Sequence, residues 1–244
     1  MRARRVVMTV WLMAGGAAVA HAQTPAAEEK TVPVFEEPRH HLIVDTPTLR
    51  ILDIQIPPGD TTLFHMHNSA MIYVPISSSR TRNQNLGEEW PAPSAAAPAA
   101  PAPAAPTRPG RINGGANYVE KPTTHRVNNI GTTLFRLIGI ANMTPGDATS
   151  PAAASPAKPE MENRWYRVER LVIAPGTSAP VPTYAGTIVV VMQTPGSAAV
   201  DGSVWQPLNG PGDLARIDGA KGHVVHNRGP AEIEVVAVAV KGAK

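Results

Sequence analysis

The apolar positions of the chain fall into six short runs rich in β-branched residues, and each run is bounded by Gly, Pro or Asn. No long 3.6-residue period of apolar positions appears, which argues against helices. Short β-branched runs between turn-forming residues are typical of antiparallel strands in a sandwich or barrel. The pattern therefore predicts an all-β protein with strands at Leu49–Ile56, Met71–Ile76, Thr132–Ile140, Arg167–Ile173, Thr187–Met192 and Ile233–Val240.

Two Pro-rich stretches interrupt this pattern, a Pro/Ala-rich one at 91–109 and a Pro/Ala/Ser-rich one within 143–162. Alternation of Pro with Ala and Ser leaves no face to bury and few backbone donors to pair. We expect both stretches to be solvated and extended. They predict two domains, an N-terminal one at 31–142 that carries the 91–109 insertion and a C-terminal one at 163–244, joined by a linker at 143–162.

The two predicted domains are related by an internal repeat. The segment RILDIQIPPG from Arg50 aligns with RVERLVIAPG from Arg167 at an offset of 117 residues, and HRVNNIG from His125 aligns with HVVHNRG from His223 at an offset of 98. The offsets differ by 117 minus 98, or 19 residues, which is the length of the 91–109 stretch. Removing that insertion restores the register, so the chain reads as a duplication.

The first residues of the chain resemble an export signal. Residues 1–22 contain a basic start, an apolar run too short to span a bilayer comfortably, and the small-x-small sequence Ala-His-Ala before Gln23. The alternative, a retained membrane anchor, lacks a flanking stop-transfer pattern. We therefore expect a mature protein without a membrane span, exported to the periplasm or the extracellular space, with a flexible N-terminus at 23–30.

Charge and cysteine content narrow the function classes. Without the three arginines of the predicted signal, 22 minus 3 leaves 19 basic residues against 19 acidic ones, so the mature chain is close to neutral. With no basic stripe interleaved with aromatic residues, a nucleic-acid partner is not expected. The absence of cysteine excludes disulfides, thiol nucleophiles and iron–sulfur clusters.

The first repeat carries histidines at a spacing that suits metal binding. Gly59 is followed after five residues by His65-x-His67, and Met71 comes three residues later. Side chains two apart in a strand point to one face, so His65 and His67 are expected to share the barrel interior. A third imidazole from His125 would complete a three-nitrogen face for a divalent cation.

These spacings resemble the two short motifs of the cupin superfamily, namely Gly, five residues, His-x-His, three or four residues, Glu, and later Pro-x-Gly, two residues, His, three residues, Asn. The resemblance covers both repeats and implies two tandem cupin-type antiparallel jelly-roll β-barrels. It also implies that His65, His67 and His125 bind a divalent metal ion, with Fe, Mn, Ni, Cu and Zn as candidates.

The first repeat departs from the motif at its fourth ligand. Cupins commonly have a carboxylate where this chain has Met71, and an uncharged thioether is a poor ligand for these ions beside imidazoles. We expect a site of three histidines, with Glu120 as a lesser candidate for a fourth ligand. A degenerate barrel whose histidines only hydrogen-bond to one another and to water is the alternative.

The second repeat lacks most of the motif. Pro182, Tyr184 and Ile188 stand at the positions equivalent to the first two histidines and the methionine, and only His223 and Asn227 remain. One imidazole cannot hold a first-row metal ion tightly. We therefore expect a structural C-terminal barrel that stabilises the first one or forms a homodimer surface. By the same resemblance, Asn227 and its equivalent Asn129 are expected to close turns at strand ends.

Residues near the predicted barrel mouth are candidates for contacts with a small-molecule substrate. They are Met71, Tyr73, Arg80 and Arg82. The two arginines suit an anionic substrate, since guanidinium groups bind carboxylates well, although such a pair more often keeps a loop solvated. The pair His40-His41 is expected at an exposed edge or in a lid over the barrel rather than as ligands.

Two functions of different classes remain open from the sequence. One is an exported metal-dependent enzyme of the cupin type, an oxygenase acting on a small organic substrate. The other is a non-catalytic exported bicupin that binds a small molecule or serves as a structural module without a functional metal. The chain contains neither Gly-x-Ser-x-Gly nor His-Glu-x-x-His, which removes the commonest serine hydrolase and zinc protease signatures.

Overall fold

The computed structural model describes residues 30–91, 110–146, 158–202 and 207–243. The predicted signal at 1–22 and nearly all of the Pro/Ala-rich insertion lie outside these ranges. Regular structure in the described part consists of strands and two 3-10 helices, η1 (Val34–Glu36) and η2 (Ala116–Val119), so the all-β fold class is confirmed. All six predicted strands form, as β3 (Leu49–Ile56), β5 (Ala70–Ser77), β9 (Phe135–Asn142), β11 (Tyr166–Ile173), β13 (Thr187–Met192) and β17 (Ile233–Val240).

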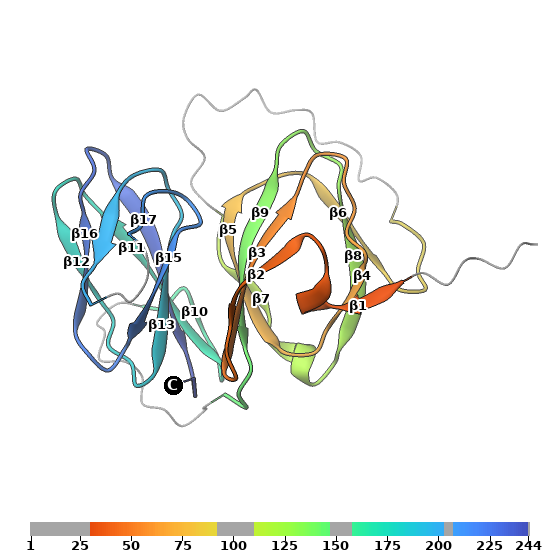
Figure 1. The fold of residues 1–244 in the computed structure, drawn as a ribbon, viewed down its shortest axis with the longest axis horizontal. Coiled ribbons are helices and arrows are strands. Elements are labelled where there is room, and N and C mark those ends of the chain that lie inside the picture. Colours follow the sequence, from red (N-terminus) through yellow and green to blue (C-terminus); the bar gives the residue numbers. More distant parts are fainter. Residues whose placement is uncertain (1–29, 92–109, 147–157, 203–206, 244) are drawn as a thin grey trace, which may run out of the picture.

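The N-terminal half forms a barrel from two facing sheets (Figure 1). The five-stranded sheet has the order β2-β3-β9-β5-β7 and the four-stranded sheet the order β1-β4-β8-β6. All neighbours are antiparallel except β1, which pairs with β4 in parallel. The remaining strands are β1 (Thr31–Pro33), β2 (His40–Asp45), β4 (Phe64–His67), β6 (Thr81–Asn85), β7 (Asn113–Gly115) and β8 (Thr123–Asn129).

The C-terminal half repeats this strand order in a second barrel (Figure 1). Its sheets have the orders β10-β11-β17-β13-β15 and β12-β16-β14. The strand β10 falls within the predicted linker 143–162 because Met161 and Glu162 pair with Val168 and Arg167 of β11. The other strands of this half are β10 (Met161–Glu162), β12 (Ser178–Val181), β14 (Ala198–Val200), β15 (Leu214–Asp218) and β16 (His223–Asn227).

The duplication is visible in the hydrogen bonds of the two predicted turn asparagines. The Asn129 amide donates to the carbonyl oxygens of Ile56 and Thr133, both at 2.8 Å, and its Oδ1 accepts from the backbone N–H of Gly131 at 3.0 Å. The Asn227 amide makes the corresponding bonds to Ile173, Ala231 and Gly229 at 2.9, 2.7 and 2.9 Å. Each asparagine closes a turn at a strand end, as predicted. The bond from Asn129 to Thr133 keeps Thr133 in the turn, so strand β9 begins at Phe135 and not at the predicted Thr132.

The motif glycines occupy equivalent turns as well. Gly59 follows β3 with a φ of 80°, and Gly176 follows β11 with a φ of 66°. Positive φ is readily adopted by glycine and is costly for residues with a Cβ atom. The first glycine of each repeat is therefore fixed by the turn that leads to the next strand.

The largest apolar core lies between the two barrels. It joins residues of β3, β5 and β9 with residues of β11, β13 and β17, among them Ile72, Ile140, Val189 and Val238, all with no exposed surface. The strand β17 is buried at every position, since one of its faces meets the N-terminal sheet and the other fills its own barrel. Burial of apolar surface is the main stabilising contribution here.

Tyr166 links the two barrels inside this core. Its side chain has no exposed surface, and its hydroxyl lies 2.7 Å and 2.9 Å from the carbonyl oxygens of Ala70 and Ile140. The same hydroxyl accepts the backbone N–H of Asn142 at 2.8 Å. A buried hydroxyl with donor and acceptor partners fixes β11 against β5 and β9.

No helix in the described residues is both long enough and apolar enough to cross a lipid bilayer.

We expect Tyr166→Phe to lower the free energy of unfolding by about 1–3 kcal/mol, because it leaves a buried backbone N–H without its acceptor. Urea denaturation followed by circular dichroism measures this change. Tyr118→Phe is the matched control, because Tyr118 is only partly buried and its loss should change stability by no more than about 0.5 kcal/mol. Equal effects of the two substitutions would contradict this role of Tyr166.

Candidate metal centre

Strand pairing brings the three predicted ligand histidines together. His65 and His125 are direct partners across the antiparallel pair of β4 and β8. His67 lies two residues from His65 on β4, and both are buried at 1% and 2% exposure while Met66 between them is exposed. Side chains two apart share a face and direct cross-strand partners are close neighbours, so all three imidazoles point into the N-terminal barrel.

The ligand atoms of the three histidines converge. One nitrogen from each of His65, His67 and His125 lies within 4.8 Å of the others. Nε2 of His67 is 3.2 Å from Nε2 of His125, and the ring centroids of the three pairs are 4.7–5.0 Å apart. Nδ1 of His65 lies 2.9 Å from the carbonyl oxygen of Leu63, which accepts its hydrogen and leaves Nε2 with a free lone pair.

Burial keeps these imidazoles neutral. Burial, together with a smaller contribution from the neighbouring histidines, lowers the pKa of His65 to about 2 and that of His67 to about 3. Burial also lowers the pKa of His125. Loss of water disfavours the charged form of a histidine, and mutual repulsion of like charges acts in the same direction. At neutral pH the rings are therefore in the uncharged form that binds metal ions.

The three histidines line a cavity of about 220 Å³ inside the N-terminal barrel. Its walls are largely apolar, with Tyr73 and Tyr118 next to the histidines and a few neutral polar side chains. Among the residues that the structure describes, no acidic, Lys or Arg side chain lines it. The other lining residues are His40, Ile54, Ile56, Thr81, Asn83, Asn113, Val127, Phe135 and Leu137.

The expectation that His40 lies at an exposed edge is wrong. His40 is 6% exposed and lines the same cavity, and its ring centroid is 4.6 Å from that of His65. Its Nδ1 donates to the carbonyl oxygen of Val34 at 2.9 Å, and burial lowers its pKa to about 4. The helix η1 folds over the barrel and supplies that carbonyl group, a feature that the His40-His41 sequence does not reveal.

The structure places the other predicted contact residues away from the cavity, except Tyr73. Arg82 donates to Asn128 at 3.0 Å and stacks on the ring of Trp90, because its neighbours Thr81 and Asn83 take the inner face of β6. Arg80 is exposed. Met71 is fully buried behind Tyr73 rather than in the lining.

Glu120, the predicted candidate for a fourth ligand, is exposed after the end of η2. The group of residues that the structure brings together for metal binding contains His65, His67 and His125 but not Glu120. The short helix η2 turns the chain before β8 begins, so proximity in sequence does not carry the carboxylate to the histidines.

The equivalent region of the C-terminal barrel is filled. Pro182, Tyr184 and Ile188, which replace the motif residues, line a space of only about 10 Å³ together with Arg167 and Glu169. Arg167 forms a buried ion pair with Glu169 at 2.8 Å. Both ring nitrogens of His223 face carbonyl oxygens, of Asp201 at 2.5 Å and of Asp218 at 2.8 Å. This barrel has no room for a ligand at the equivalent site.

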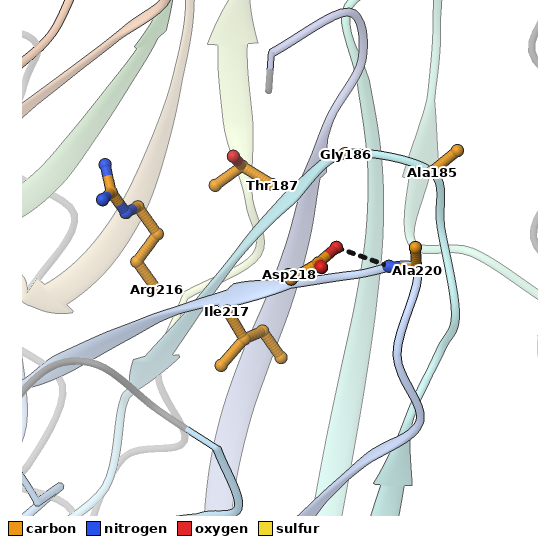
Figure 2. A pocket seen from close by; sticks show the side chains of 7 residues that line it. All are labelled: Ala185, Gly186, Thr187, Arg216, Ile217, Asp218 and Ala220. Carbon is orange, nitrogen blue, oxygen red and sulfur yellow. Dashed lines mark hydrogen bonds between the residues drawn. The ribbon is translucent and has the colours of Figure 1, made fainter.

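A larger cavity of about 550 Å³ lies beside β13 and β15 in the C-terminal half (Figure 2). Its polar side chains are Thr187, Arg216 and Asp218, and Asp218 accepts the backbone N–H of Ala220 at 3.1 Å. The described residues of this lining include no histidine, and none of them belongs to the group of convergent ligand atoms. We therefore assign the candidate functional site to the smaller cavity with the three histidines.

Comparisons with known proteins establish the fold. No protein-family model and no curated protein matches this chain. Among solved structures, AerE from Microcystis aeruginosa superimposes with a TM-score of 0.52 at 12% identity, over 84% of this chain and 98% of that one. YhhW from Escherichia coli superimposes with a TM-score of 0.51 at 14% identity, over 84% and 88%.

A third structure is similar, the bacterial pirin YhhW from Escherichia coli in complex with nickel(II). It has a TM-score of 0.51 at 15% identity, over 80% of this chain and 82% of that one. At these identities the similarity shows the fold alone. The chain has an all-β fold of several antiparallel sheets, which is consistent with the cupin-type jelly-roll fold that the motif spacings predict.

Glu37 supports the strand that carries two of the histidines. Its carboxylate, 1% exposed as a residue, accepts the backbone N–H groups of Leu63 at 3.1 Å and of Arg39 at 2.7 Å. Leu63 in turn accepts the hydrogen of His65. No sequence motif marks this glutamate. Its partner Leu63 is 26 residues away along the chain and reaches it only after the segment with η1 has folded over the barrel.

We expect Glu37→Ala to lower the free energy of unfolding by about 1–3 kcal/mol, because it leaves backbone N–H groups without an acceptor. Thermal and urea denaturation measure the change. Glu36→Ala is the matched control, since Glu36 is exposed next to it and should cost no more than about 0.5 kcal/mol. An effect of Glu36→Ala as large as that of Glu37→Ala would argue against the bonds described here.

Proposed function

We propose that the N-terminal barrel is a metal centre that acts on a small molecule. The observation that carries this proposal is the convergence of ligand nitrogens from His65, His67 and His125 on one face of the cavity in the N-terminal barrel. Three neutral imidazoles with no carboxylate suit a borderline divalent ion such as Fe(II), Mn(II), Ni(II), Cu(II) or Zn(II). A three-nitrogen face leaves coordination positions open toward the cavity.

The surroundings of the histidines fit this assignment. Nδ1 of His65 is occupied by the carbonyl oxygen of Leu63, and Nδ1 of His67 lies 3.2 Å from the Tyr73 hydroxyl. Such outer contacts are typical of metal-binding imidazoles, because they leave the other ring nitrogen available. Nε2 of His67 and of His125 approach to 3.2 Å, which brings two ring nitrogens to one point.

The cavity limits the ligand to a small and mainly apolar molecule. Its volume is about 220 Å³, and no Arg or Lys side chain from the described part of the chain lines it. A carboxylate held by Arg80 or Arg82, as considered from the sequence, therefore has no support. The polar groups that remain for orientation are Tyr73, Tyr118, Asn113 and the open metal positions. We infer a small organic ligand that offers oxygen or nitrogen donors to the ion.

The reaction class that we propose is that of a cupin-type oxygenase. A bound ion would supply the chemistry by polarising a chelating substrate or activating dioxygen at its open positions. The chain itself holds the three ligands, limits water through the apolar walls and orients the substrate against two tyrosines. Export to the periplasm or the extracellular space is part of this proposal, and mass spectrometry of the mature N-terminus tests for cleavage before Gln23.

A non-catalytic binding module is the second candidate. It is favoured by the described residues of the cavity lining, which include no carboxylate and no Lys or Arg side chain that could act as an acid or base beside the histidines. Oxygen uptake by the metal-loaded protein with small aromatic and aliphatic substrates distinguishes the two. Turnover eliminates the binding module, whereas saturable ligand binding without turnover favours it.

We expect a bound divalent ion to stabilise the protein by about 2.7 kcal/mol at a free concentration of 100 times its Kd. Calorimetric titration and melting curves with Fe(II), Mn(II), Ni(II), Cu(II) and Zn(II) measure binding. His65→Ala should abolish it, because it removes one of three ligands.

His41→Ala is the matched control for this experiment, since His41 is exposed and outside the group of ligands. It should bind metal like the native protein. Failure of the native protein to bind any of the five ions, or equal binding by His65→Ala, would disprove the metal centre.

A further inference from the structure

A line of polar atoms runs from the candidate metal centre into the sheet behind it. Nε2 of His125 lies 3.2 Å from Nε2 of His67, and Nδ1 of His67 lies 3.2 Å from the Tyr73 hydroxyl. That hydroxyl lies 3.7 Å from the sulfur of Met71, within hydrogen-bond reach of a thioether. Met71 and Tyr73 are two residues apart on β5 and therefore share its inner face.

The hydrogens on this line can be arranged in two directions. If the Tyr73 hydroxyl donates to His67, then His67 carries its hydrogen on Nε2, the line contains two hydrogen bonds, and the sulfur of Met71 has none. If the hydroxyl donates to Met71, its oxygen accepts from Nδ1–H of His67, and Nε2 of His67 accepts from His125. The second direction makes three hydrogen bonds and uses every contact.

We propose that Tyr73 and Met71 are positioning residues that hold the hydrogen of His67 on Nδ1, so that the lone pair of its Nε2 faces the cavity. This inference rests on the proposed metal centre and deepens it. Met71, which stands where cupins commonly have a carboxylate ligand, then acts as a hydrogen-bond acceptor two steps behind the ligand atom. Its thioether suits this task, because it is a weak acceptor that never donates.

The packing around Met71 and Tyr73 holds them in this arrangement. Gly139 of β9 is the cross-strand partner of Tyr73. A Cβ atom at Gly139 would lie 3.5 Å from both Met71 Cε and Tyr73 Cε1, and 3.2 Å from Ile54 Cδ1. The two side chains thus rest against a glycine backbone, whereas the second repeat pairs Val190, the equivalent of Tyr73, with Ala237. Close packing restricts the rotation of the Tyr73 ring.

Nitrogen-15 NMR of the histidine rings in the full-length metal-free protein tests this inference directly. We expect the native protein to show His67 with its hydrogen on Nδ1. In Met71→Leu, which keeps the side-chain volume, the hydroxyl loses its second acceptor and should donate to His67, so the hydrogen moves to Nε2. A native His67 with its hydrogen on Nε2, or a spectrum unchanged in Met71→Leu, would overturn the proposal.

Zinc titration gives a second readout. Removal of a contact behind a metal ligand typically weakens metal binding about 10–100-fold, and we expect losses in this range for Tyr73→Phe and Met71→Leu. Tyr166→Phe is the control, because it removes a buried tyrosine hydroxyl outside the site and should leave the affinity unchanged. Native affinity in Tyr73→Phe, or an equal loss in Tyr166→Phe, would contradict a positioning role.

The two readouts separate this inference from the metal proposal. If the native protein shows the Nδ1 hydrogen and Met71→Leu moves it, the positioning role stands even when no ion binds, and only the metal centre fails. If zinc binds to the native protein and to all variants alike, the metal centre stands and the positioning role fails.

Discussion

The apolar contact between the two five-stranded sheets is the constraint on which the rest of the structure depends. Each of these sheets has one face toward its own barrel and one toward the other barrel, so neither relies on its interior alone for burial. Among the described residues, sixteen buried ones form the interior core of the C-terminal barrel and six form that of the N-terminal barrel. Burial of the outer face of the N-terminal five-stranded sheet against the C-terminal sheet stabilises the N-terminal barrel. Its interior can therefore hold the cavity with the histidines.

Much of the fold was predictable from sequence because each strand carries a local signal. Strands β3, β13 and β17 match their predicted bounds because β-branched residues fill them and turn-forming residues end them. The duplication was predictable because Gly59 and Asn129, like their equivalents in the second repeat, are each required by the backbone conformation of a turn. The short strands β1 and β10 were not predicted, because neither has a pattern of its own: β1 is held by pairing with β4, and the two residues of β10 pair with β11 across a short turn.

The candidate site was predictable only in part, for a similar reason. His65, His67 and His125 follow from strand periodicity and motif spacing, which act within a few residues. His40 and Glu37 approach the site through η1, which folds over the barrel and has no periodic pattern. Arg82 was misplaced because the register of β6 is set by its pairing with β8, and a shift of one residue moves a side chain to the other face.

The ion pair inside the C-terminal barrel has a consequence for protein engineering. Arg167 and Glu169 lie beside Tyr184 in the space that corresponds to the N-terminal cavity. Grafting histidines onto positions 182 and 184 would therefore not create a twin centre, since the guanidinium and carboxylate would still fill the volume. Arg167 also pairs with Glu162 at 2.6 Å, so the two residues belong to a larger group of ion pairs. Redesign of this barrel would have to replace Arg167 and Glu169 at the same time as the ligand positions are introduced. Creating a metal site here by one substitution at a time is therefore unfavourable.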